Sequence, residues 1–222
     1  MAMKVQVLRT PRAAGLVGIA FAVLIGAAIV LVRASIPSGE GALTSSPLTL
    51  SSRSGVQTAL ALIPFAGIFF LWFMGAVRAH VGPGEDKFLS TVFLGSGLVF
   101  VATLFGAAAA AGSLLATTEV ASPGPPRAEL SYFGQHLTYS LLTTYSMRMA
   151  AVFVLSASTV ALRLGTFPRW LVLLGYLVGV TLLFVVPNVR LAELVFPLWA
   201  LVVSLHIVVA SFRARPAEAQ AF

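Results

Sequence analysis

The chain has 222 residues, of which 59% are hydrophobic and 9% are charged, with a net charge of +7. Soluble domains carry about 25% charged residues, so a soluble globular protein of this length could not cover so much apolar surface. The absence of cysteine excludes disulfides, thiolate metal sites and thiol catalysis.

Six apolar runs of about twenty residues or more take up most of the chain. A helix needs roughly 20 apolar residues to cross about 30 Å of hydrocarbon. We therefore predict an all-α, polytopic membrane protein with six transmembrane helices in a single bundle, one domain over residues 1–222. The predicted spans are 13–32, 56–77, 88–116, 137–161, 168–186 and 191–212.

The first run follows Lys4 and Arg9 and so begins like a signal peptide. It is longer than the usual apolar region of a signal peptide, which has about 7–15 residues. We therefore expect an uncleaved first helix.

The basic residues are scattered in ones and twos at the ends of the runs, unlike the stripe or arm of a nucleic-acid-binding protein. Nine of them fall on one side of a six-span topology and four on the other, with Arg148 inside a span. Basic residues are retained on the cytoplasmic side. The sequence thus predicts a multi-pass protein of the bacterial inner membrane with both termini cytoplasmic.

The two outer loops are predicted at residues 34–55 and 117–131. Both are rich in small, polar or turn-forming residues, and the second contains Ser122-Pro123-Gly124-Pro125-Pro126. They are too short and too polar to suggest a folded outer domain.

Small residues recur at four-residue spacing within several runs: Ala14, Gly18, Ala22 and Gly26; Ala102, Gly106 and Ala110; and Gly175 with Gly179. In lipid, such faces allow helix backbones to approach closely. We expect them to pack within the bundle, with contacts to a partner or a second copy as the alternative.

Polar residues inside the spans are few, and ionisable ones are costly enough in lipid to be candidate functional residues. Arg148 lies near the middle of the fourth run, and His136, Ser140 and Thr144 precede it at successive steps of four, which would place all four on one helical face. Glu193 lies at the outer end of the sixth run.

From these residues we predict a polar vestibule open to the outer face, with Arg148 at its floor and Thr144, Ser140 and Glu193 on its walls. Pro197, four residues after Glu193, would disturb its helix and leave a carbonyl unpaired. His206 lies deeper in the sixth run and joins the candidate binding residues, although a packing role suits it at least as well.

Several strings of the sequence resemble a group of six-helix membrane proteins of actinobacteria whose function is unknown. The strings that carry the resemblance are Pro11–Gly15, Pro64–Ile68, Leu71–Gly75, Thr91–Gly97, Tyr145–Met149, Pro168–Leu171, Leu174–Tyr176, Phe196–Trp199 and Ser204–His206. The resemblance covers the whole chain and implies the six-helix architecture but no activity.

The sequence contains no H-E-x-x-H, no G-x-S-x-G and no phosphate-binding glycine-rich loop. We therefore expect a non-enzymatic protein without cofactor or metal. Its expected role is that of an accessory or scaffolding subunit of a larger membrane assembly. The alternative is a small carrier that holds a lipid headgroup or solute in the vestibule around Arg148. Expected partners are membrane lipids and another membrane protein or a second copy, but no nucleic acid.

Overall fold

The structure, a computed structural model, describes residues 11–36, 50–81, 87–120, 125–186, 189 and 191–213. Almost all of these residues are helical and no strand occurs among them, which confirms the all-α class. The α-helices are α1 (Pro11–Ser35), α3 (Leu50–Val81), α4 (Lys87–Val120), α5 (Pro125–Tyr139), α6 (Met147–Leu164), α7 (Arg169–Phe184) and α8 (Val195–Arg213), joined by the π-helix η1 (Ser140–Ser146) and the 3₁₀-helix η2 (Ala192–Leu194).

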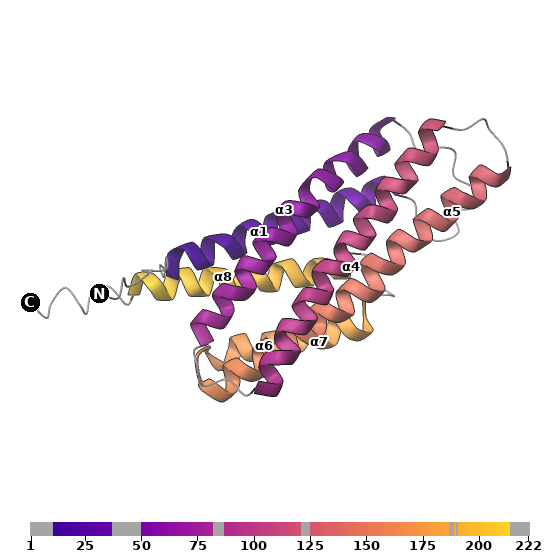
Figure 1. Ribbon diagram of the computed structural model, residues 1–222. Coiled ribbons are helices and arrows are strands. Elements are labelled where there is room, and N and C mark those ends of the chain that lie inside the picture. Colours follow the sequence, from indigo (N-terminus) through magenta and orange to yellow (C-terminus); the bar gives the residue numbers. More distant parts are fainter. Residues whose placement is uncertain are drawn as a thin grey trace, which may run out of the picture.

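The helices form a closed ring in which α1 lies between α3 and α8, and α7, α6 and α4 complete the circle (Figure 1). The helix direction alternates around this ring. Gly15 of α1 lies against Val208 of α8, and Gly26 lies nearest to Pro197, so α1 and α8 are antiparallel. The start of α1 and the end of α8 therefore meet at one end of the bundle.

Within the described part of the chain, five helical stretches are long and apolar enough to cross a membrane: Gly15–Ser35, Ser52–Ala79, Lys87–Ala116, Glu129–Leu164 and Ala192–Phe212. The sixth, α7, has only 16 residues, or about 24 Å. It nevertheless spans the same thickness as its neighbours. Phe167 before it touches His206 near the end of α8, whereas Glu193 after it meets Arg33 at the far end of α1.

The ring is filled by aromatic side chains, so that its centre is a packed core. Six phenylalanines and one tryptophan from five helices lie within ring-stacking distance of one another and are at most 3% exposed: Phe21, Phe70, Phe73, Phe100, Phe153, Phe196 and Trp199. Edge-to-face pairs such as Phe100 with Phe196, at 5.1 Å between centroids, add to the stability of such clusters.

The glycines of α1 and α7 pack inside the bundle, in agreement with the expectation from their spacing. A methyl group at Gly18 would meet Phe73 at 2.6 Å and also Ser204, and one at Gly179 would meet Leu155 at 2.5 Å. The stripe on α4 differs, because Ala102 is exposed and Gly106 has room for a methyl group. Only part of that helix's small face therefore serves close packing in the bundle.

The second outer loop is shorter than predicted. Helix α4 continues to Val120 and α5 begins at Pro125, so most of residues 117–131 are helical. Together α4 and α5 form an antiparallel hairpin, which extends beyond α1 and α8 at the upper right of Figure 1. The first outer loop is also shorter than predicted, because α3 begins at Leu50.

Candidate functional site

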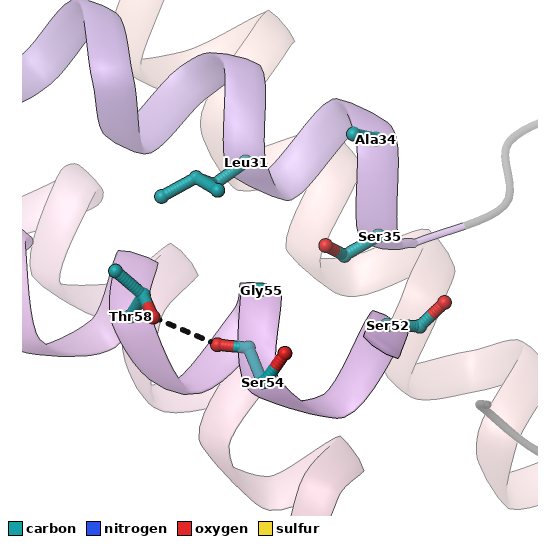
Figure 2. Close-up of a pocket in the computed structure, with 7 residues that line it drawn as sticks. All are labelled: Leu31, Ala34, Ser35, Ser52, Ser54, Gly55 and Thr58. Atoms are coloured by element: carbon teal, nitrogen blue, oxygen red, sulfur yellow. Dashed lines mark hydrogen bonds between the residues drawn. The ribbon is translucent and has the colours of Figure 1, made fainter. Parts of the chain in front are cut away.

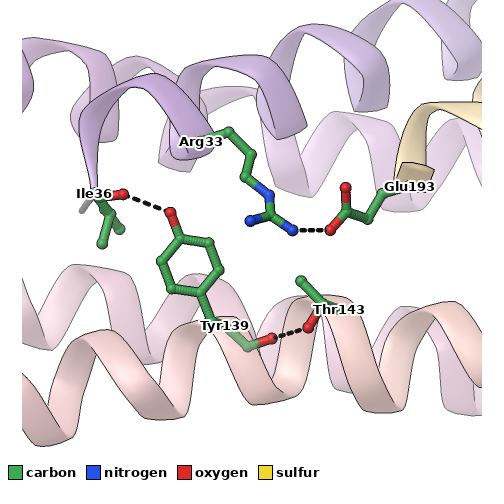
Figure 3. A network of polar contacts seen from close by, with 5 residues as sticks. All are labelled: Arg33, Ile36, Tyr139, Thr143 and Glu193. Atoms are coloured by element: carbon green, nitrogen blue, oxygen red, sulfur yellow. Dashed lines mark hydrogen bonds and ion pairs between the residues drawn. The ribbon is translucent and has the colours of Figure 1, made fainter. Parts of the chain in front are cut away.

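The main buried polar cluster among the described residues contains an ion pair between Arg33 and Glu193 (Figure 3). Arg33 comes from the last turn of α1, and Glu193 comes from η2, just before α8. The Glu193 side chain is fully buried and that of Arg33 is 12% exposed. The pair joins the first and last helices of the chain at the end of the bundle where the α4–α5 hairpin emerges.

Local backbone structure holds Glu193 in place. Leu191 adopts a left-handed conformation with φ 66°, and the chain then makes one 3₁₀ turn into α8. The carboxylate thus sits at the start of a helix, where the dipole favours negative charge. Pro197 lies in the first turn of α8, where its missing N–H has no helical partner to lose. The expected disturbance of the helix at this proline is therefore wrong.

Tyr139, at the end of α5, completes the cluster. Its hydroxyl donates a hydrogen bond to the carbonyl of Ile36 at 2.5 Å, and its ring lies 5.0 Å from the Arg33 guanidinium carbon. The first contact satisfies a carbonyl at the end of α1, and the second is a cation–π contact. Three segments, α1, η2 and α5, therefore meet at this point.

The π-helix η1 continues from Tyr139 and carries much of the polar stretch noted in the sequence. Thr143 donates to the Tyr139 carbonyl at 2.9 Å, and Ser146 donates to the Leu141 carbonyl at 2.9 Å and lies 3.0 Å from the Thr103 hydroxyl of α4. The wider turn of a π-helix breaks the four-residue step. His136 and Arg148 are exposed, while Ser140 and Thr144 are partly buried.

The predicted vestibule does not form. Arg148 is exposed on the surface of α6, and neither a hydrogen bond nor an ion pair joins it to another described residue, whereas Glu193 is sealed inside and paired with Arg33. Arg148 therefore lies on the surface and Glu193 in the interior, so the two residues do not share the predicted site. His206 lies at the other end of the bundle, where it makes edge contacts with Phe167 and Trp170 at 5.8 and 6.4 Å.

Sequence reasoning missed Arg33 and Tyr139 as members of the buried cluster. Arg33 follows an apolar run directly, which favoured its interpretation as a topology determinant. A usable signal existed, because Arg33 and Glu193 both flank the outer ends of predicted spans and carry opposite charge. Two such groups at the same depth are candidates for pairing in lipid.

Two buried atoms of the ion pair have no partner in the described part of the chain: Arg33 Nε and Glu193 Oε2. Such atoms are commonly satisfied by ordered water. The described residues contain no group of three potential metal ligands. The cluster is thus equipped to hold helices together and to bind small polar molecules such as water.

A pocket of about 380 Å³ opens nearby, between the end of α1 and the start of α3 (Figure 2). It is lined by Leu31, Ala34, Ser35, Ser52, Ser54, Gly55 and Thr58, and Thr58 donates to the Ser54 carbonyl at 2.9 Å. Its hydroxyl-rich wall contains none of the predicted site residues. A second gap, between α1, α3, α4 and η1, has about 10 Å³, which is little more than one water molecule needs.

The geometry offers a buried structural cluster, an exposed arginine and a helical hairpin that extends past α1 and α8. Each of these features bears on what the protein does. No family model, no curated protein and no solved structure matches this chain.

Proposed function

We propose that this protein is a non-enzymatic accessory or scaffolding subunit of a larger membrane assembly. The observation that carries the proposal is the exposed apolar surface of α5, which belongs to a helical stretch of 36 residues, longer than a bilayer requires.

The hairpin is too long for the bilayer. The apolar stretch Glu129–Leu164 has 36 residues, at most about 54 Å along its axis, and even a tilt of 40° leaves about 40 Å. Lys87 at the start of α4 and Arg163 at the end of α6 are exposed and mark one membrane boundary. The excess over about 30 Å of hydrocarbon therefore lies at the other end, at α5.

Helix α5 exposes large apolar side chains in that extension. Leu130 and Phe133 are 52% and 61% exposed, and Tyr132 and Leu137 each 39%. Outside lipid, a contiguous apolar patch of this kind favours a protein–protein contact, and aromatic residues are enriched in such interfaces. This supports a protein partner that covers α5.

The distribution of charge supports an inner-membrane location with cytoplasmic termini. Arg78, Lys87, Arg163, Arg169 and Arg213 lie at helix ends that the alternating topology brings to the same end of the bundle. The hairpin is at the opposite end. By the positive-inside rule, the hairpin then faces the outside.

The carrier alternative has less support. The vestibule that it requires around Arg148 is not formed, and the centre of the ring is packed with phenylalanine. A carrier would need a second conformation in which these aromatic contacts separate.

Co-purification tests the proposal. The tagged protein, extracted in mild detergent, should bring down a stoichiometric membrane partner, and Phe133→Asp should abolish this because it places a charge in the apolar contact. Glu129→Ala, on the same helix and also exposed, serves as the matched control and should retain the partner. Purification without a stoichiometric partner would contradict the proposal. An undiminished amount of co-purified partner with Phe133→Asp would also contradict it.

A further inference from the structure

Arg148 carries a charge in the part of α6 that we place within the membrane. It lies on the lipid-facing side of α6, in the exposed class, without an intramolecular acceptor in the described part of the chain. An isolated guanidinium in hydrocarbon is costly. It needs an acceptor that the protein itself does not offer.

The depth of Arg148 follows from its helix. Arg163 marks the boundary at one end of α6, and fifteen residues separate it from Arg148, or about 22 Å at 1.5 Å per residue. In a core of about 30 Å, Arg148 Cα therefore lies roughly 8 Å below the opposite boundary, the one beside the α4–α5 hairpin.

The direction of the side chain reduces this distance. Long side chains in an α-helix point back toward its N-terminus and cover the preceding turn, and the N-terminus of α6 faces the hairpin side. The guanidinium thus rises by about one turn, roughly 5 Å. This is the snorkelling geometry that brings a charged head to the lipid phosphates.

Tyr145 extends the same surface toward the headgroups. It is 55% exposed and lies three residues before Arg148, about 5 Å nearer the boundary. Between them, Ser146 and Met147 are buried, so Tyr145 and Arg148 share the outward face. A phenolic hydroxyl at the interface and a guanidinium just below it can together donate to phosphate oxygens.

We propose that Tyr145 and Arg148 form a binding site for the phosphate of an anionic phospholipid in the leaflet on the hairpin side. Charge complementarity selects the ligand, since a guanidinium binds phosphate in a bidentate manner. The lipid's acyl chains then cover the apolar surface of α6 below Arg148. This site is independent of the proposed protein contact on α5.

Titration with phosphatidylglycerol, followed by native mass spectrometry of the delipidated full-length protein, tests the site. Arg148→Met should weaken the tightest binding step by roughly tenfold or more, as expected for loss of a charge-assisted hydrogen bond. Arg148→Lys should keep part of the affinity, and Tyr145→Phe should lower it by a smaller factor. Arg169→Met, at the opposite end of the bundle, should leave this step within about twofold of wild type.

Two further probes identify the source of the phosphate. Diacylglycerol, which lacks phosphate, should not bind at this step, and glycerol 3-phosphate in the buffer should not displace the lipid. Unchanged lipid affinity in Arg148→Met would overturn the proposal. Loss of a co-purifying membrane protein from that variant without loss of lipid would also overturn it, and would identify the acceptor as a carboxylate of a partner.

Discussion

Arg33 and Glu193 form an ion pair that closes one end of the bundle by joining its first and last helices. A buried ion pair contributes little net stability compared with apolar side chains of the same volume, but loss of one partner leaves the other charge buried and unpaired. Glu193 is fully buried and Arg33 nearly so. Removal of either residue alone should therefore destabilise the protein by more than the net stability that the intact pair contributes.

Arg33→Met should lower the free energy of unfolding by about 3–5 kcal/mol, because the Glu193 carboxylate then has no counter-charge. Arg33→Met combined with Glu193→Met should cost clearly less than the sum of the single changes. The measurement is an unfolding titration in detergent, analysed as a double-mutant cycle. Arg169→Met, at the opposite end of the bundle, is the matched control and should change stability by less than about 0.5 kcal/mol, since that arginine is exposed. Additive effects of the two ion-pair substitutions would show that the pair is not coupled.

Gly18 determines how closely α1 approaches its neighbours. Gly18→Ala should destabilise the protein by about 1–3 kcal/mol, because the added methyl group meets Phe73 at 2.6 Å as well as Ser204. Gly95→Ala, on the exposed face of α4 with nothing within 4 Å, should be neutral or stabilising by up to about 1 kcal/mol. Thermal unfolding followed by circular dichroism compares the two. Equal midpoints would mean that α1 does not pack as closely as the structure shows.

At the scale of secondary-structure elements, the helices differ in length in a way that shapes the molecule. Helix α7 has 16 residues and α8 has 19, while α4 has 34. The short helices end near the boundary marked by Arg33 and Glu193, and the long ones pass it. The α4–α5 hairpin thus extends past the ends of α1 and α8.

The absence of cysteine makes this hairpin simple to test. Phe133→Cys should react quickly with a membrane-impermeant maleimide in intact cells, because the side chain is 61% exposed and we propose that α5 lies outside the bilayer. Val99→Cys is the control. It is 45% exposed in the structure but lies about 18 Å from Lys87 along α4, and lipid should protect it. Similar labelling of both would place the hairpin inside the membrane.

The π-helix is the element that redirects the polar residues of the fourth span. Ser146 bonds to Leu141 five residues earlier and to Thr103 of α4, which fixes the wider turn against a neighbouring helix. This turn leaves Tyr145 and Arg148 on the lipid-facing surface while it buries Ser146 and Met147. A regular α-helix through the same residues would present them differently.

The whole molecule is a ring of helices with a basic end and an end that carries the hairpin. Its orientation in the membrane is a prediction from charge. Reporter fusions at residues 45, 125 and 188 should be active outside the cytoplasm, and those at 82, 166 and 222 inside it. Activity of an external reporter at residue 82 or 222 would reverse the orientation or change the number of spans.

The sequence by itself determined the helical class, the approximate spans and the division of basic residues between the two ends. These properties follow from local composition, since an apolar run of bilayer length has no other stable backbone conformation in lipid. The extension of α5 was not accessible in this way, because Pro125–Glu129 has the composition of a loop. In the structure these residues form the start of α5, and α5 as a whole packs on α4.

Only the tertiary structure decided which polar residues meet. Arg33 and Glu193 are 160 residues apart, and their pairing depends on the antiparallel contact of α1 with α8. The exposure of Arg148 depends on a π-turn whose hydrogen bonds involve another helix. Depth along a single helix can be counted from sequence at 1.5 Å per residue, but the direction around its axis, and hence the partner, is set by the neighbours against which the helix packs.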